Sequence, residues 1–404
     1  ANGSSLIDTF SSVGARGVNN LASKLQLSLF PIDAPFFQFD PEPNAFGNLE
    51  EEQKSQLTIA LRSREADITK DIEVRGTRVA LYEALRHLIV GGTCVLHLPD
   101  DSAPKVFSLP EFVVERDGSG RLETLLIGQE MRPEDVPEGV PTVPSSSTKT
   151  PENVKVITLI KRLPSGKFRI SQEVNGSEIA AGSREVTEDR LPYKVLRLNR
   201  ISGEDYGRGF VEEHLGDLQT IEGLTQAAVE VTAAMAQVRY LVDPAGTTNP
   251  EDLNNAPNGS FVPGKDQDIT VLQTQKAMDL RVVQEMLGAL SRQLQQSFLL
   301  TSGIQRDGER VTATEISSLV RELEGALGGI YSNLTAELQL PLVLFTSARM
   351  VEEEKIPKLE EDVLRPRIVT GVEALGRSQE LNRLQTAAGL LNSIFGPQSA
   401  QGIL

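Results

Sequence analysis

The stretch that most limits the possible folds lies within residues 300–342, where a polar loop leads into a long amphipathic segment. Gly303 and Gly308 bracket the loop, and glycine lets a chain change direction at little cost. Thr312 stands three residues before Glu315, which is the spacing of a capping box at the start of a helix. The loop is therefore expected to end where a helix begins.

A long helix is predicted after this loop, from Thr312 as far as Pro341. Its apolar side chains recur at steps of three and four residues, which places them on one helical face. The residues on that face are Ile316, Val320, Leu323, Leu327, Ile330, Leu334 and Leu338. Pro341 should kink or end the helix because proline lacks a backbone donor. Neither the loop nor the helix carries a catalytic constellation, so the pair points to a mechanical role.

The first half of the chain changes from helical to strand patterns. Residues 4–89 show mostly helical spacing, whereas residues 93–198 show strand signals. Hairpin turns are predicted at residues 117–120 and 164–166, because their Gly and Pro residues favour tight turns. Residues 133–150 are rich in Pro, Ser and Thr and are expected to form an exposed loop. This order predicts an α+β fold.

Two further long helices are predicted around a small insert. Residues 209–238 and 276–300 carry apolar side chains at helical steps and would span roughly 45 and 37 Å. The insert, residues 241–273, is punctuated by prolines and glycines, which leaves room only for short strands and turns.

Composition narrows the class of protein. A chain of 404 residues is long enough for a sizeable core and for two or three domains. No apolar run reaches the ~18 residues of a membrane helix, and no signal-peptide pattern opens the chain. We expect a soluble protein made in a cytoplasm. Cys94 is the only cysteine and is predicted to be a buried strand thiol.

The net charge of −16 argues against a protein that grips nucleic acid. Tight binding to DNA needs basic groups that neutralise phosphates. An acidic surface instead repels DNA, which would suit a conduit through which DNA passes without sticking. The same charge also fits ordinary solubility.

The sequence predicts no catalytic residue, no metal site and no cofactor. His87, His97 and His214 are isolated from other metal-ligating residues. No phosphate-binding loop of the GxxxxGK[ST] type is present, so ATP hydrolysis by that route is excluded. Three carboxylate clusters favour solvated faces over metal sites, because adjacent acids on a helix point in different directions. They lie at residues 50–52, 352–354 and 360–362.

The predicted helix at residues 209–238 carries acids and neither Lys nor Arg. The acids are Glu212, Glu213, Asp217, Glu222 and Glu230. In a single chain they would form an exposed acidic face. In a ring of identical chains they would form acidic girdles, and the choice depends on the assembly.

Several blocks of this sequence together resemble the portal proteins, or head-to-tail connectors, of short-tailed double-stranded DNA bacteriophages. The blocks occur in the family's order, from Ser12 to Leu381. They are SVGARGVNNLASKLQLSLFP, LYEALRHLIVGGTCVLHLP, GEDYGRGFVEEHLGDLQTIEGL, LVDPAGTTNPEDL, GIQRDGERVTATEI, ELEGALGGIYSNLTAELQLPLV and TGVEALGRSQEL.

The resemblance implies a mainly helical portal fold with a β-rich wing portion. Its parts would be the wing at residues 1–205, the first stem helix at 206–240, the clip at 241–275, the second stem helix at 276–300, the channel loop at 301–311, the long wing helix and return at 312–369, and the start of the crown at 370–404. Members of the family usually extend beyond both ends of this chain, so we expect either a compact portal or a portion of one.

The resemblance also implies a non-enzymatic homo-dodecameric ring at one capsid vertex of the virion, assembled in the host cytoplasm. Double-stranded DNA would pass through its axis without sequence specificity during packaging and ejection. Other implied partners are major capsid and scaffolding proteins, the terminase large subunit, tail adaptors and internal core proteins, and no membrane is involved. A tail adaptor, a core protein or a Mg-dependent packaging enzyme is the alternative.

Functional residues are expected in two further segments. In the channel loop, Arg306 and Arg310 would make transient phosphate contacts, which Asp307 and Glu309 would keep weak. The whole DNA-facing set is Gln305, Arg306, Asp307, Gly308, Glu309 and Arg310. The docking set of the clip is Asp243, Asn249, Glu251, Asp252, Lys265 and Asp266.

Overall fold

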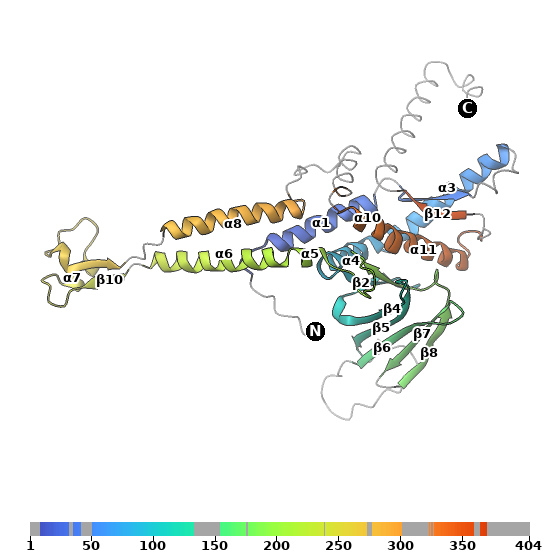
Figure 1. Cartoon of the computed structure of the whole chain (residues 1–404), viewed down its shortest axis with the longest axis horizontal. Coiled ribbons are helices and arrows are strands. Elements are labelled where there is room, and N and C mark those ends of the chain that lie inside the picture. The colour runs from blue at the N-terminus through green and yellow to red at the C-terminus, as the bar shows by residue number, and fades with distance from the viewer. Residues whose placement is uncertain are drawn as a thin grey trace, which may run out of the picture. The chain divides into compact units, whose positions relative to one another are not determined.

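The chain forms two compact units, and many of their helices and strands are labelled in Figure 1. Unit 1 comprises Ala1–Gly17 and His214–Ser302, and unit 2 comprises Val18–Glu213 and Gly303–Leu404. The computed structural model describes residues 9–31, 35–41, 51–132, 154–174, 177–237, 239–272, 277–300, 323, 325, 327–358 and 364–369. The predicted channel loop, the predicted loop at 133–150 and the predicted crown lie outside these residues.

Three helices supply much of the core of unit 2. They are α1 (Val13–Leu29), whose first turn belongs to unit 1, α3 (Glu51–Val74) and α4 (Thr77–Gly91). The periodic residues Val18, Leu21, Leu25 and Leu29 of α1 are all buried, as their spacing predicted. Helix α4 ends at Gly92, whose φ of 74° and N–H bond of 2.8 Å to the Leu88 carbonyl close the helix.

Two small sheets adjoin these helices. Strand β1 (Phe37–Pro41) pairs antiparallel with β12 (Leu364–Ile368), which joins distant parts of the sequence. Strand β2 (Thr93–His97) lies between β3 (Lys105–Phe107) and β9 (Tyr193–Arg197). Cys94 is fully buried on β2, so the predicted buried strand thiol is confirmed.

A five-stranded antiparallel sheet follows the chain order β4-β5-β6-β7-β8. A short 3₁₀ helix, η1 (Leu109–Glu111), leads into it. The strands are β4 (Phe112–Arg116), β5 (Leu122–Met131), β6 (Val154–Arg162), β7 (Phe168–Val174) and β8 (Ser177–Val186). Both predicted hairpins are confirmed, and Gly120 and Gly166 supply the positive φ that each turn requires.

One face of this sheet forms a hydrophobic core together with the three-stranded sheet β3-β2-β9. Alternate residues point inward, among them Leu125 and Ile160, which pack in one cluster with Val95 of β2 and Tyr193 of β9. His97 lies beside this core, with its ring stacked on Tyr193 at a centroid distance of 4.3 Å. Burial, together with the nearby Lys105 and Arg184, lowers the pKa of His97 to about 4.

The helix predicted from Thr312 to Pro341 is interrupted before Pro341, so its continuity was predicted wrongly. Described residues before Gly328 are helical, but Gly328 is a turn with a φ of 35°. Helix α10 (Gly329–Leu334), a π-helix η4 (Thr335–Gln339) and α11 (Leu340–Glu352) follow. The apolar face itself is confirmed at Leu323, Leu327, Leu334 and Leu338, which are all buried.

Pro341 neither ends nor visibly breaks the chain's helical path. It occupies the first turn of α11, where its missing donor costs little. The preceding π-helix bonds the Leu340 N–H to the Thr335 carbonyl, which is the i to i−5 pattern of a π-bulge. Glu337 lies in this π-helix and forms an ion pair with Arg197 of β9.

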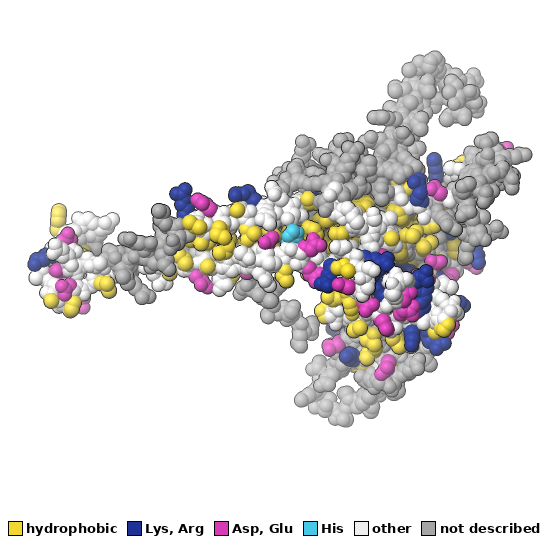
Figure 2. Space-filling view, in the orientation of Figure 1, with side chains coloured by type: hydrophobic (Ala, Val, Ile, Leu, Met, Phe, Trp, Pro, Cys, Tyr) yellow, Lys and Arg dark blue, Asp and Glu magenta, His cyan; other side chains and the backbone are white. Residues whose placement is uncertain are grey.

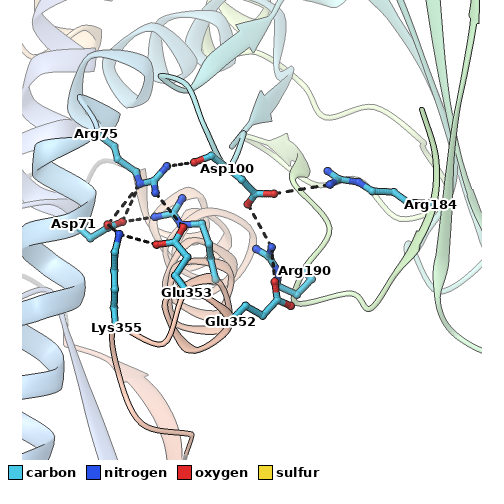
Figure 3. Close-up of polar contacts among 9 residues, drawn as sticks. Asp71, Arg75, Asp100, Arg184, Arg190, Glu352, Glu353 and Lys355 are labelled. Carbon is cyan, nitrogen blue, oxygen red and sulfur yellow. Dashed lines mark hydrogen bonds and ion pairs between the residues drawn. The ribbon is translucent and has the colours of Figure 1, made fainter. Parts of the chain in front are cut away.

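Nine charged residues link α3, α11, β8 and two neighbouring loops of unit 2 (Figure 3). Arg349 of α11 donates to Asp71 of α3. Asp100, in the loop after β2, lies 3.3 Å from Arg190 and 3.8 Å from Arg184 of β8. The remaining members are Arg75, Glu352, Glu353 and Lys355. Because Arg349 is only 5% exposed and Asp71 12%, their pair is shielded from solvent and bonds α11 to α3.

Unit 1 contains α6 (Leu215–Ala236) and α8 (Ala277–Ser297), which lie side by side (Figure 1). Between them are β10 (Arg239–Val242), α7 (Pro250–Asn255), a 3₁₀ turn η3 (Asp266–Asp268) and β11 (Ile269–Leu272). The short helix α5 (Phe210–Glu213) precedes α6 and belongs to unit 2. The α+β class is confirmed, and with four antiparallel sheets the described chain is less dominated by helices than expected.

Candidate functional site: a helix pair and its insert

The α6–α8 pair is held by the apolar faces that the sequence predicts. Ile221 of α6 and Leu294 of α8 are buried, and Phe298, just beyond α8, is fully buried. The other predicted positions on α8, which include Val283 and Leu287, are half-buried. The first turn of α1 packs here too, because a Cβ at Gly17 would come within 2.6 Å of the Phe298 ring.

The predicted helix at 209–238 is divided, so its five acids do not share one helix. His214 has a φ of −108° and a ψ of 9°, which is outside the helical region and separates α5 from α6. Glu212 and Glu213 lie on α5, whereas Asp217, Glu222 and Glu230 lie on α6.

Four of these five acids already accept hydrogen bonds within the chain. Glu222 accepts from the backbone N–H groups of Phe10 and Ser11, at 2.6 and 2.9 Å, and so fixes the entry to α1. Asp217 accepts from Gln293 of α8 at 3.4 Å. The other two are bonded close by in sequence, Glu212 to the Gly209 N–H and Glu230 to Gln226. Glu222 is therefore first a structural residue, which sequence reasoning missed because its partners lie more than 200 positions away.

The segment of residues 239–272, called the insert from here on, contains the predicted docking residues. Asn249 caps α7 by accepting from the Glu251 N–H at 3.2 Å, and Asp243 accepts from the Ala245 N–H at 2.9 Å. Helix α7 itself was not predicted, although an Asn followed by Pro is a signal for a helix start. Glu251, Asp252, Lys265 and Asp266 are exposed.

The insert is organised around a carboxylate that sequence reasoning missed. Asp268 accepts from the backbone N–H groups of Thr247 and Thr248 at 2.9 and 3.1 Å, and from the Thr248 hydroxyl at 2.9 Å. These bonds, led by the Thr248 hydroxyl, hold the pKa of Asp268 below its ordinary value. The Thr248 hydroxyl also accepts from the Lys265 N–H at 2.8 Å. The segment after β10 is therefore bonded to the segment before β11.

The predicted channel-loop residues 305–310 lie outside the described residues. Within the part of the chain that the structure describes, no three His, Cys, Asp or Glu side chains are grouped to hold a metal ion. No described helix combines the length and the apolar character needed to cross a membrane.

Comparisons with known proteins cover almost the whole chain. The family model described as "Bacteriophage head to tail connecting protein" matches residues 4–403. The chain is 37% identical over 384 residues to the portal protein of Escherichia phage T7, covering 92% of this chain and 72% of that protein. It is also 37% identical over 390 residues to the portal protein of Enterobacteria phage T3, covering 92% and 71%.

A solved structure entitled "Virion of native gene transfer agent (GTA) particle" contains a more distant match. Its TM-score is 0.44 at 11% identity, covering 93% of this chain and 86% of that one. The family match and the identity to two phage portal proteins together show that this chain belongs to the bacteriophage head-to-tail connecting proteins, the portal proteins.

Proposed function

We propose that this portal protein assembles into a dodecameric ring at one capsid vertex, through whose axis double-stranded DNA passes during packaging and ejection. The observation that carries the proposal is the family match over residues 4–403. As a member of this family the chain is a structural, non-enzymatic component of the virion.

In this ring, α6 and α8 would form the stem and the insert would form the clip. Residues 1–205 and 312–369 would form the wing, residues 301–311 the channel loop, and residues 370–404 the start of the crown. The pairing of α6 with α8 and the compact insert between them support this division.

Partners would divide between the two ends of the ring. The terminase large subunit, which supplies ATP hydrolysis, would dock on the insert during packaging, and tail adaptors would replace it afterwards. The acids and the lysine that stay exposed on the insert support docking there. Capsid, scaffolding and internal core proteins would contact the rest of the ring, which would assemble in the host cytoplasm.

The acids of α6 would line part of the DNA path. Helix α6 carries Asp217, Glu222 and Glu230 and no Lys or Arg, so a ring of copies would present negative charge to the phosphates. Repulsion keeps passing DNA from binding tightly. Glu222 is engaged by two backbone N–H groups that fix the start of α1. Asp217 and Glu230 each accept instead from a glutamine side chain and are the stronger candidates.

Electron microscopy of the purified chain over a concentration series tests the ring. We expect particles with twelve-fold symmetry and an axial hole wide enough for B-form DNA. A monomer at every concentration, also in the presence of scaffolding protein, would refute self-assembly of this chain.

The channel loop has its own test. Arg306→Ala combined with Arg310→Ala should reduce packaging or DNA retention, because the loop would lose its transient phosphate contacts. Arg121→Ala combined with Arg169→Ala at the five-stranded sheet removes the same charge at exposed positions outside the stem and the loop and serves as the control. Unchanged packaging in the loop variant would mean that the loop is a structural turn.

A further inference from the structure

The insert has a polar interior, and several of its large apolar side chains lie on its exterior among charged ones. Among its residues whose exposure is described, only Thr248 and Asp268 are buried. Its large apolar side chains face solvent instead: Tyr240 is 64% exposed, Leu241 53%, Leu253 40% and Phe261 104%. Figure 2 shows hydrophobic side chains on this surface among charged ones. Because burial of apolar side chains away from water is favourable, we expect a binding partner to cover these residues.

Phe261 is the most exposed of these residues, and its loop is held in place. Before it, the Ser260 N–H bonds to the Pro257 carbonyl at 3.1 Å, with Gly259 at a φ of 85°. This is the geometry of a type II turn. After it, the Lys265 N–H bonds to Thr248 at 2.8 Å. The aromatic ring is thus presented on a loop fixed at both ends, which reduces the entropy lost on binding.

Charge indicates what kind of partner would cover this ring. Apart from the buried Asp268, the insert carries Arg239 and Lys265 against four acids, a net charge of −2. The acids are Asp243, Glu251, Asp252 and Asp266. A partner with basic residues around an apolar pocket complements such a surface, whereas the same surface on a second copy would repel it.

We infer that Phe261 is the apolar anchor of a docking surface on the insert, and that its occupant is a protein with an apolar pocket rimmed by basic residues. This inference rests on the proposed docking function and adds its central contact. Fully desolvated aromatic residues at the centre of an interface often dominate its binding energy, and the charged residues around them set its salt dependence.

The test measures binding of the full chain to two separate probes, the tail adaptor and the terminase large subunit of the same phage. Phe261→Ser should weaken the binding of at least one probe by about tenfold or more. Phe261→Leu keeps an apolar side chain and should retain part of the affinity. Val113→Ser on β4 is the matched control, because Val113 is 61% exposed outside the insert, and it should bind as the wild type does.

A second arm tests the charge. Glu251→Lys combined with Asp252→Lys should weaken the same complex, and added salt should weaken the wild-type complex. Melting temperature and ring formation, followed for every variant, should stay unchanged.

The possible failures differ. If the wild type binds neither probe, the docking function proposed for the insert is wrong. If the wild type binds and Phe261→Ser binds equally well, docking stands and the anchor is wrong. If Phe261→Ser instead abolishes assembly of the oligomeric ring, a second copy of the chain covers the Phe261 side chain, and the inference is overturned.

Discussion

Arg197 of β9 and Glu337 of the π-helix form a largely buried ion pair with more than one hydrogen bond. The Arg197 backbone N–H donates to Glu337 Oε2 at 3.0 Å, its Nε donates to Oε1 at 3.0 Å, and its Nη2 donates to Oε1 as well. Arg197 is 2% exposed and Glu337 16%. The pair fixes the π-helix η4 to the three-stranded sheet β3-β2-β9.

Removal of one partner should therefore be costly. We expect Arg197→Met to lower the free energy of unfolding by about 3–5 kcal/mol, because Glu337 would remain buried without its countercharge. The double variant Arg197→Met, Glu337→Leu should recover much of the loss. Urea denaturation measures both, and a loss as small as that of the exposed-pair variant Arg281→Ala would contradict the prediction.

Gly17 should not tolerate a methyl group. Gly17→Ala would push a Cβ into the Phe298 ring, and overpacking of this kind costs about 1–3 kcal/mol. Gly223→Ala on α6 is the control, since a Cβ at this position meets nothing within 4 Å. This substitution should raise the free energy of unfolding by roughly 0.5–1 kcal/mol through helix propensity. Equal effects of the two substitutions on thermal unfolding would refute the close approach.

Asp268→Asn should loosen the insert without unfolding unit 2. All of the threonine donors converge on one carboxylate oxygen, Oδ2, and the neutral amide oxygen of Asn accepts hydrogen bonds more weakly than a charged carboxylate does. Hydrogen exchange and limited proteolysis should accelerate within residues 239–272, while protection of β4–β8 stays unchanged. Because the folded pKa of Asp268 is lowered, its contribution is present above the unfolded pKa and is lost as the pH falls through the folded pKa. Acid should thus loosen the wild-type insert and alter the variant less.

His97 should make the stability of unit 2 depend on pH. Its folded pKa of about 4 lies below its ordinary value of 6.5, so the unfolded chain binds the proton more readily. Stability should fall as the pH is lowered from 6.5 toward 4. His97→Gln should flatten this slope, whereas His87→Gln, on the exposed side of α4, should leave it in place. The midpoint of urea denaturation, measured over this pH range for each variant, tests the prediction, and an unchanged slope in His97→Gln would contradict it.

Elements set by local chemistry could be predicted from the sequence. The turns near Gly120 and Gly166 follow from the residues within them, and the buried face of α1 follows from its own spacing. The breaks at His214 and Gly328 could not be predicted, because the apolar periodicity continues through both. Around the second break, Asn333 donates to the Arg197 carbonyl at 2.7 Å, so contacts with a distant strand accompany the local geometry.

Spacing in the sequence predicted where acidic side chains lie along the chain, but it did not predict the long-range contacts that these side chains make. The five acids predicted on one helix are divided between α5 and α6, and spacing alone does not reveal the bonds of Glu222 to the start of α1. Asp268 was missed because its threonine partners are about twenty positions away, and only the folded insert brings them together. Phe261 gave no periodic signal, since its position in a loop leaves it outside any helical or strand pattern.

The polar interior of the insert has an evolutionary consequence. A segment that is ordered by hydroxyl groups and one carboxylate does not depend on its outward apolar residues for its conformation. Substitutions at Phe261 or Leu253 can then accumulate without the loss of folding that core substitutions cause. If the insert docks a partner as proposed, related portal proteins could diverge in the residues that contact the partner while they keep the backbone that presents those residues.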